Sequence, residues 1–528
     1  MPGRGIACPT SAIPNDDRMP TQAPPRSTTL RSKTPRSIGL RVDAVRLERS
    51  WLLSGLLLAV LAGASALFAL NLGHSSLFID EVYSWRASRG SLGDLTDAVR
   101  FSEVTPPLYY LILHAWMQVC GGDSEALLRI PSVVAGVALV GALHWLGCLV
   151  AGRVAGLIAA SLGALSPIVL LYSQQVRAYV WVMLALTIAV AAVIQATRGR
   201  SGRWLALGAL AAGCAVLLHY TSIFVLAPLA LWVWCRRDLG VRQRVAFVAG
   251  VVLALLAVAP LALLQLSEGH QDSTASYASL TMFNALRIAG TPFDGRATDG
   301  LILWRELGAV VVIDALALLA FAERFRGLTA RWLIVTCGVL PLGIVCFVSA
   351  VVQPIALTRY SAVAAPFILV AIGVVAAHAH RALRTALLVG ALAASVAALV
   401  ASARDHGQNP DTRAAVSTIA SGWREGDVVS GIGLLGFDGA LSYYADKLLA
   451  PGARDLAEFG TLDAAIDAPR VFDAATSGKR LWFIADPPMG PAQLRETLGR
   501  LDYRATLTRV FDGNAPVQLV RAEPSPRR

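Results

Sequence analysis

The chain reads Trp51-Leu-Leu-Ser-Gly-Leu-Leu-Leu-Ala-Val-Leu-Ala-Gly-Ala-Ser-Ala-Leu-Phe-Ala-Leu-Asn-Leu72 and shortly afterwards Ser76-Leu-Phe-Ile-Asp-Glu-Val-Tyr-Ser-Trp85. The first segment carries no charged residue and is about long enough to cross the hydrocarbon core of a bilayer once. Its length, and the lack of a cleavage-site pattern after it, favour a retained membrane helix over a signal peptide. The acidic pair Asp80 and Glu81 is then expected just past the outer end of this helix, where a carboxylate can accept a proton or hold a metal.

Composition places the chain among polytopic membrane proteins. Of its 528 residues, 55% are hydrophobic and 15% are charged, whereas soluble domains carry about 25% charged residues. The net charge of +11 lies mostly in a basic N-terminal tail and in short arginine-rich loops, so it indicates membrane orientation rather than binding of nucleic acid. The seven cysteines show no paired spacing of the kind that binds zinc or builds a disulfide framework.

Hydropathy predicts a mainly α fold with about eleven transmembrane helices in residues 51–404. Residues 1–50 are rich in Pro, Ser, Thr and Arg and are expected to form a disordered, basic cytoplasmic tail. The predicted spans are residues 51–72, 131–150, 154–172, 178–196, 204–220, 221–235, 245–266, 304–321, 332–352, 361–377 and 384–402.

The segment Pro107 to Cys120 decides the orientation. It is apolar but short for a span, and if it lies on the membrane surface, the arginine-rich loops between the later spans all fall on the cytoplasmic side. The positive-inside rule therefore predicts a long first outer loop, residues 73–130, with the N-terminus inside and the C-terminus outside. The high content of Ala, Arg and Gly is typical of a GC-rich bacterial genome, which makes the predicted membrane a bacterial inner membrane.

Residues 405–528 differ from the rest in alternating strand-like and amphipathic helical pieces. Val428 to Ile432, Leu481 to Ala485 and Val517 to Val520 are typical of strands, and Ala492 to Leu501 is typical of a helix. We therefore expect a small extracytoplasmic α/β domain that caps the outer cavity, engages the acceptor, or serves packing and stability. A second outer segment, residues 267–303, is long and partly amphipathic, which suits either a surface helix that covers a donor or a connector on the headgroups.

Polar residues gather in the predicted outer loops. The first loop holds Asp80, Glu81 and, in Ser102 to Tyr110, Glu103, while two arginines lie at outer span ends against the usual charge bias. A guanidinium can form paired hydrogen bonds with a phosphate, so these arginines and acids together indicate a lipid-phosphate site. The other clusters are Tyr172 to Tyr179 with Arg177, His219 with Tyr220, and Gln353 to Tyr360 with Arg359.

These motifs resemble the polytopic GT-C glycosyltransferases that use polyprenyl-phosphate sugars, in particular the family-39-like proteins grouped with rhizobial lipopolysaccharide glycosyltransferases and protein O-mannosyltransferases. The resemblance covers about residues 51–405. It is carried by the Asp-Glu pair in the first outer loop, by Pro106 to Tyr110, by the Ser-Gln-x-x-Arg-x-Tyr turn Ser173 to Tyr179, and by Arg359-Tyr360 with Pro366.

The resemblance implies inverting transfer of a sugar, such as mannose or another hexose or pentose, from a polyprenyl phosphate to a hydroxyl of an envelope glycan, lipopolysaccharide, glycolipid or protein. In this reading Asp80 is the general base and Glu81 its catalytic or structural neighbour. The donor phosphate would be bound by Arg177, Tyr179, Arg359 and Tyr360, and the substrate or a second acid function by Glu103, Tyr109, Tyr110 and Gln174.

Two questions stay open from the sequence. Glu103 with His219 or His270 could hold a divalent cation, or the enzyme could work without a cofactor. A polymerase or ligase of lipid-linked glycans would share an outer arginine-lined site, and a secondary transporter is a more distant alternative because the predicted spans are nearly uncharged and show no repeat.

Overall fold

The structure is a computed structural model. It describes residues 36–526 except for 102, 200, 268–278, 295–329 (of which only Asp314 and Leu318 are described), 405–410, 434–440, 452–456, 460 and 512–515. The chain divides into two units, Met1–Trp51 and Leu52–Arg528. The described part of the first unit is the beginning of helix α1, which starts at Arg36 and so extends further toward the N-terminus than the predicted span. His270 and the predicted span 304–321, apart from Asp314 and Leu318, lie outside the described residues.

Six helices are long and apolar enough to cross a membrane, judged by length and composition within the described residues, or seven if one bent pair counts as a single span. The bent pair, α6 and α7, turns by 61° at Ser166, where Pro167 begins α7 and cannot continue the preceding helix. The six are Trp51–Ala69 of α1, Glu125–Ala151 (α5), Tyr179–Gly199 (α8), Val241–Ser267 (α11), Arg331–Val351 (α14) and Thr358–His378, and the bent pair is Arg153–Leu165 with Pro167–Ser173.

By this measure the described residues support six or seven of the eleven predicted spans. Two others correspond to shorter apolar helices: α9, Gly202–Leu218, has 17 residues, or about 26 Å of helix, which is less than the roughly 30 Å hydrocarbon core. Tyr220–Trp234, which comprises η1 and α10 (Ile223–Trp234), is also short. The last predicted span lies in α17, Arg381–Arg404, which is not among the six.

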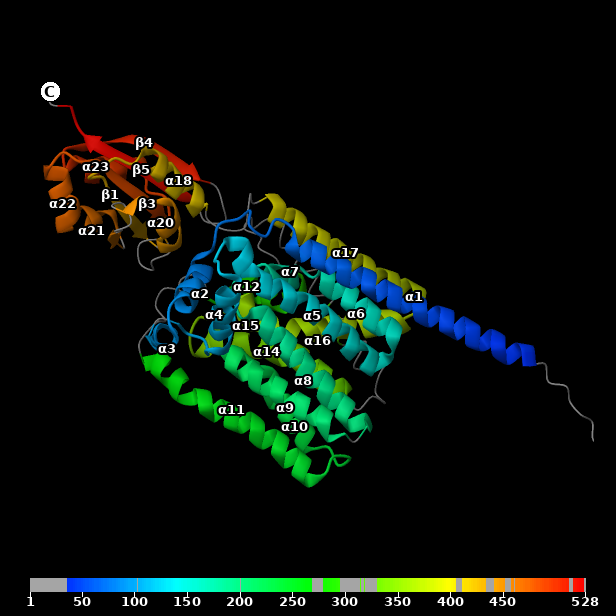
Figure 1. The fold of residues 1–528 in the computed structure, drawn as a ribbon. Coiled ribbons are helices and arrows are strands. Elements are labelled where there is room, and N and C mark those ends of the chain that lie inside the picture. The colour runs from blue at the N-terminus through cyan, green and yellow to red at the C-terminus, as the bar shows by residue number, and fades with distance from the viewer. Residues whose placement is uncertain are drawn as a thin grey trace, which may run out of the picture. The chain divides into compact units, whose positions relative to one another are not determined.

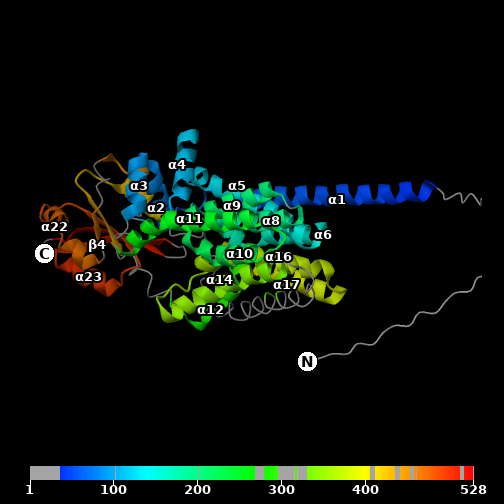
Figure 2. The same cartoon turned by 90° about the horizontal axis from the view of Figure 1, so that it is seen from below.

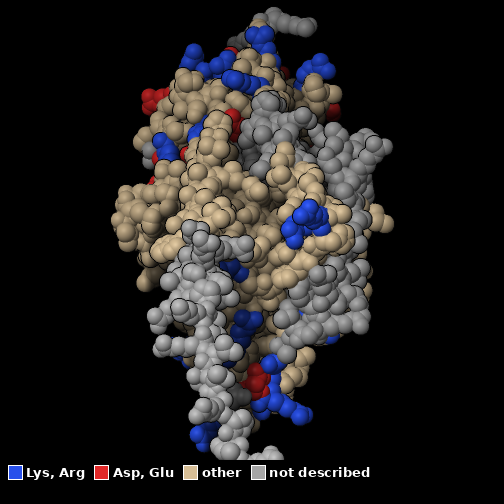
Figure 3. Space-filling view, turned by 90° about the vertical axis from the view of Figure 1, so that its right-hand side faces the viewer, with Lys and Arg blue, Asp and Glu red and all other residues tan. Residues whose placement is uncertain are grey.

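Helices pack around a buried centre. In Figures 1 and 2, α5, α8, α9, α10 and α16 (Ala365–His378) run side by side, and α5 packs on α6, α8 and α16. Of the most apolar stretch in Thr358–His378, 89% is buried, against 11% in Trp51–Ala69, so the former lies at the centre and the latter presents its side chains outward. Figure 3 shows mostly uncharged side chains over the middle of the face it presents, with charged ones more frequent toward the two ends of the view.

Small residues allow the helix backbones to approach closely. A Cβ added at Gly147 of α5 would lie 2.7 Å from the Cα of Gly156 in α6, which is too close for any larger residue. Packing of this kind is common between membrane helices. Lipid supplies no hydrophobic driving force for their association, and small residues let the backbones approach closely enough to gain van der Waals contacts.

The first loop and the segment before α14 hold short helices. The first loop contains α2 (Ile79–Arg89), α3 (Leu92–Phe101) and α4 (Leu108–Cys120). The segment Pro107 to Cys120 thus forms a helix, α4, with 13 residues, and its location on the membrane surface stays a prediction. Within the predicted segment 267–303, the structure describes two helical elements, α12 (Met282–Ala289) and η2 (Thr291–Phe293). Two further short elements, α15 (Thr358–Ser361) and η3 (Ala362–Ala364), lead into α16.

The C-terminal residues form a five-stranded mixed sheet in the order β2-β1-β3-β5-β4. Strand β1 is parallel to β2 and β3, whereas β5 is antiparallel to β3 and β4. The three predicted strands are β1, β3 and β5, while the two edge strands, β2 and β4, were missed. Strand β2 has only three residues, and the middle of β4 is largely exposed, as expected of an edge strand. The strands are Val428–Gly433, Ala457–Phe459, Leu481–Asp486, Tyr503–Phe511 and Val517–Pro524, and the helices are α18 (Thr412–Gly422), α20 (Ser442–Leu448), α21 (Leu462–Ile466), α22 (Pro469–Thr476) and α23 (Pro491–Gly499).

Candidate active site

Asp80 lies in the first turn of α2, which begins only ten residues after α1 ends. The start of α2 is stabilised by its own sequence, because the Glu81 carboxylate accepts a hydrogen bond of 2.9 Å from the amide of Phe78. The Asp80 side chain remains 26% exposed, whereas Glu81 is buried. The two neighbouring acids therefore stand in different environments, and only Asp80 is open to a substrate.

Glu81 is one half of a buried ion pair with Arg129 of α5. The Arg129 guanidinium donates from Nε and Nη2 to the two carboxylate oxygens, each at 3.0 Å, and both side chains are at most 2% exposed. Burial is the largest influence on the Glu81 carboxyl and acts to raise its pKa, but the charge and hydrogen bonds of Arg129 and the amides of Phe78 and Val176 together lower the pKa. Glu81 therefore stays ionised and fastens α2 to α5 and to the turn after α7.

Two arginines contact Asp80 from different parts of the chain. Arg359 of α15 lies with its Nη1 3.2 Å from Asp80 Oδ2, and its side chain is 22% exposed. Arg177, which follows α7, is buried and donates from Nη1 to the backbone carbonyl of Asp80 at 3.1 Å and to Ser84 Oγ at 3.3 Å. The structure thus brings together the acid and both arginines that the sequence singled out.

Glu103 extends this charged group into the buried part of the first loop. Its Oε2 lies 3.6 Å from Arg177 Nη1 and accepts a hydrogen bond of 2.6 Å from the hydroxyl of Tyr110, which in turn lies 2.5 Å from Thr105 Oγ1. Because Tyr110 uses its proton for Glu103, Thr105 must be the donor to Tyr110. Burial raises the pKa of the Glu103 carboxyl above its usual value, although Arg177 and Tyr110 act in the opposite direction. Its Oε1 is buried and has no hydrogen-bond partner within the described residues.

Aromatic rings line up beside the two arginines. The rings of Tyr172 and Tyr179 lie 4.6 Å apart, Tyr179 lies 5.3 Å from the ring of His219, and His219 lies 6.5 Å from Tyr360. The guanidinium of Arg359 lies 5.3 Å from the centre of the Tyr360 ring. Tyr179 and Tyr360 therefore lie next to the predicted phosphate-binding arginines.

Other predicted residues have contacts of a structural kind. Gln174 donates from its amide to the carbonyls of Phe68 at 3.2 Å and Leu70 at 3.0 Å, so it fastens the end of α1. Tyr109 is buried, and its ring lies edge-on to Tyr110 at 5.9 Å. These contacts position the first loop, and the predicted substrate-binding role of Gln174 and Tyr109 remains a prediction.

Sequence reasoning missed two buried polar residues. Arg129 has its partner Glu81 48 positions away, and Gln265 of α11 donates to the carbonyl of Val99 at 2.7 Å while it accepts from Tyr220. The available signal was that each is a polar residue within a predominantly apolar helix, which usually faces a buried partner.

The predicted metal site receives no support from the described residues, since these contain no group of three or more His, Cys, Asp or Glu side chains placed to hold an ion. His219 is buried, with its Nδ1 2.9 Å from the Thr221 hydroxyl and 3.2 Å from the Thr221 amide. Because His270 lies outside the described residues, a site that includes it stays a prediction.

Comparison with known proteins adds one sequence match. The family described as dolichyl-phosphate-mannose-protein mannosyltransferase matches residues 104–263, a range that includes Arg129, Arg177 and His219. Among the curated proteins, none matches the chain.

Solved structures of low sequence identity share the fold. The chain is similar to the archaeal oligosaccharyltransferase AglB from Archaeoglobus fulgidus, with a TM-score of 0.53 and 13% identity, covering 85% of this chain and 71% of that one. It is also similar to ArnT from Cupriavidus metallidurans bound to undecaprenyl phosphate, with a TM-score of 0.51 and 13% identity, covering 88% of this chain and 98% of that one. The family match over residues 104–263 and the shared fold together confirm the resemblance of this chain to the GT-C glycosyltransferases of the mannosyltransferase family.

Proposed function

We propose that the protein is an integral membrane glycosyltransferase that moves a sugar, such as mannose or another hexose or pentose, from a polyprenyl phosphate to a hydroxyl. The acceptor is an envelope glycan, glycolipid or protein on the outer side of a bacterial inner membrane. The N-terminus is cytoplasmic and the C-terminal sheet extracytoplasmic, in accord with the positive-inside rule.

The observation that carries this proposal is the contact between Asp80 and Arg359. A partly exposed carboxylate suited to accept a proton lies 3.2 Å from a partly exposed guanidinium suited to bind a phosphate. In an inverting transfer the attacked carbon lies between the acceptor oxygen and the leaving phosphate oxygen, so a bound donor would separate this acid and this cation and leave each of them beside one end of the reaction.

In the proposed reaction, the acceptor hydroxyl attacks the anomeric carbon of the donor from the side opposite the phosphate. The new bond between this oxygen and the carbon forms as the bond from carbon to phosphate oxygen breaks, so the configuration inverts. Asp80 takes the proton of the hydroxyl, and the phosphate oxygen leaves with the bonding electron pair. Arg359 stabilises the charge that develops on the departing phosphate.

Buried residues beside Asp80 and Arg359 hold α2 in place and add polar groups to the site. Arg177 donates to the backbone of Asp80 and to Ser84, and it is buried, so it positions α2 and adds positive charge beside the phosphate. Glu81 holds α2 through Arg129. Glu103 offers a buried carboxylate oxygen that lacks a partner within the described residues, which suits contact with a sugar hydroxyl.

The lipid part of the donor is supported by similar structures. ArnT is bound to undecaprenyl phosphate, and AglB is in complex with an inhibitory peptide and a dolichol-phosphate. A polyprenyl chain gains about 0.8 kcal/mol for each buried methylene, so the membrane itself localises such a donor and the protein need recognise only phosphate and sugar.

A donor panel tests the proposal. The purified protein in lipid nanodiscs is incubated with polyprenyl-phosphate sugars and envelope acceptors, and the lipid product is identified by mass spectrometry. Release of polyprenyl monophosphate together with a glycosylated acceptor is expected. Release of a polyprenyl pyrophosphate from lipid-linked glycans would favour a polymerase or ligase instead. A parallel sample with a chelator tests the divalent-cation prediction, since loss of transfer and its return with added metal would establish a metal requirement.

A further inference from the structure

The linker between α1 and α2 is held by side chains rather than by regular structure. From Leu72 to Ser76, every backbone carbonyl accepts a hydrogen bond from an arginine. Arg129 of α5 donates to Leu72 at 2.7 Å and to Ser75 and Ser76 at 3.0 Å each. Arg413 of α18 donates to Gly73 at 3.1 Å and also to His74. Arg413, from the C-terminal part of the chain, thus helps to hold in place the segment that leads to Asp80.

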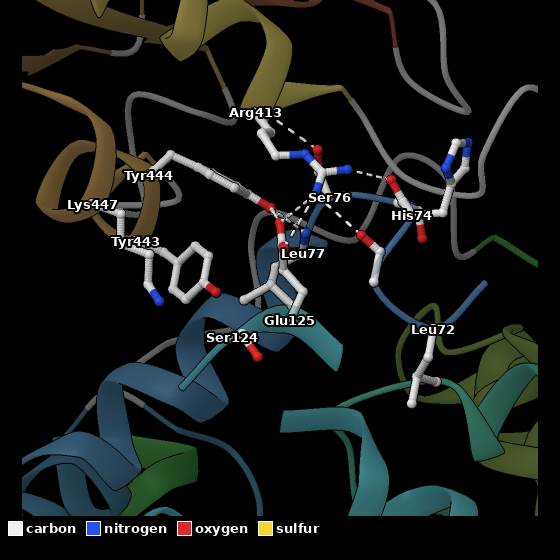
Figure 4. Close-up of polar contacts among 12 residues, drawn as sticks. Leu72, His74, Ser76, Leu77, Ser124, Glu125, Arg413, Tyr443, Tyr444 and Lys447 are labelled. Atoms are coloured by element: carbon white, nitrogen blue, oxygen red, sulfur yellow. Dashed lines mark hydrogen bonds and ion pairs between the residues drawn. The ribbon is translucent and has the colours of Figure 1, made fainter. Parts of the chain in front are cut away.

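Tyr444 of α20 completes this arrangement. Its hydroxyl accepts a hydrogen bond of 2.6 Å from the amide of Leu77 and donates one of 2.9 Å to Glu125 Oε1. Glu125 also accepts from Arg413 at 3.2 and 3.3 Å. Figure 4 shows Arg413 and Tyr444 converging on Glu125 beside Ser76 and Leu77.

Two residues of α5 connect these contacts to the acid pair. Glu125 and Arg129 are four residues apart and so lie on one face of the first turns of α5. Glu125 binds the C-terminal residues, and Arg129 binds Glu81 next to Asp80. The Ser76 hydroxyl further accepts from the Arg413 amide at 3.2 Å, which ties the linker to the N-terminus of α18.

We infer that the C-terminal α/β part is a positioning element of the active site, and that Arg413 and Tyr444 set the place of Asp80 by fixing the linker at Gly73, His74 and Leu77. This inference rests on the proposed function. Neither residue touches the reacting atoms in it. Asp80 lies only three residues after Leu77, so a shift of the linker moves the base directly, and a displacement of about 1 Å can cost up to roughly 100-fold in rate.

The variant Tyr444→Phe tests this inference, because it removes only the hydroxyl that joins Leu77 to Glu125. We expect kcat for sugar transfer to fall about tenfold while KM for the donor changes less than about twofold, since Arg359 is untouched. Amide hydrogen exchange of Leu77 should accelerate in the same variant. The variant Arg413→Gln should lower kcat by a similar factor. The variant Arg413→Lys should keep more of the wild-type kcat than Arg413→Gln, because it retains a positive charge near Glu125.

The matched control is Tyr503→Phe. The Tyr503 hydroxyl donates to the carbonyls of Ala475 and Lys479 within the C-terminal part, so the same chemical change weakens that part without touching the linker. We expect it to lower the thermal stability but to leave kcat unchanged.

The outcomes separate the two proposals. If the wild type transfers sugar and Tyr444→Phe keeps its kcat, or if Tyr503→Phe lowers kcat equally, the positioning inference is overturned while the proposed function stands. If the wild type transfers no sugar from any donor, the proposed function fails, and the inference fails with it.

Discussion

Arg359 and Asp80, which are 279 positions apart in the sequence, form an ion pair with 3.2 Å between Nη1 and Oδ2. Both side chains are partly exposed, so each can also reach a bound substrate. A donor phosphate would compete with Asp80 for Arg359, and its binding would release the carboxylate to accept a proton. In the proposed function, donor binding would thereby be coupled to freeing the Asp80 carboxylate for proton transfer.

The change Arg359→Gln is expected to weaken binding of polyprenyl phosphate about 10- to 100-fold, because a charged hydrogen-bond donor to the phosphate is lost. The matched control is Arg86→Gln, which removes an exposed positive charge from α2. Affinity can be measured by titrating the lipid into protein in nanodiscs. Equal affinities of the two variants would show that Arg359 does not bind the phosphate.

Asp80→Asn should strengthen binding of the same lipid phosphate by roughly two- to fivefold, because it removes the competing carboxylate from a partly exposed ion pair worth about 0.5 to 1 kcal/mol. The titration used for Arg359 measures this effect. Weaker binding in this variant would indicate that Asp80 orients Arg359 toward the phosphate instead of competing with it.

Glu81→Gln is expected to lower the free energy of unfolding by about 3 kcal/mol near neutral pH, because it leaves Arg129 buried without its anion. Since the pKa of Glu81 is lowered in the folded state, the stability it contributes is present above its usual pKa of 4.5 and is lost as the pH falls below that value. The difference in melting temperature between wild type and variant should therefore shrink as the pH falls below 4.5. Glu425→Gln, at an exposed site, is the control. A difference in melting temperature between wild type and Glu81→Gln that does not change with pH would contradict the lowered pKa of Glu81.

Glu103→Gln is expected to show the opposite dependence on pH. Burial raises the pKa of Glu103 above its usual 4.5, so the stability it contributes is present at low pH and is lost as the pH rises through the raised value. The wild type should accordingly lose stability relative to the variant as the pH rises above 4.5. Thermal unfolding of the two proteins at increasing pH measures the effect. If the stability of the wild type instead increased relative to that of the variant as the pH rises, the charge of Arg177 would outweigh burial in setting the pKa of Glu103.

Much of the membrane part could be predicted because long apolar stretches have few alternatives. The spans in α1, α5, α8, α11 and α14 follow from hydropathy alone. The bend at Pro167 and the short α9 depend on how neighbouring helices pack, which hydropathy does not measure.

The candidate site was predictable where a residue type implied its chemistry and unpredictable where a distant partner decided its role. Asp80 and Arg359 were both chosen from the sequence, and the structure places them in contact. The contacts of Gln174 with the carbonyls of Phe68 and Leu70 could not be predicted from the sequence. The role of Arg413 depends on carbonyls more than 300 positions away, and no local pattern marks such a contact.

Transfer by the Asp80→Asn variant tests the central claim most directly. The wild type, the variant and the control Asp97→Asn, an exposed acid in the same loop, are assayed with the donor that the panel identifies. If Asp80 is the general base, its variant should lose about 10²- to 10⁴-fold in kcat while it still binds polyprenyl phosphate, and Asp97→Asn should match the wild type. Transfer by Asp80→Asn at the rate of the wild type would contradict the account.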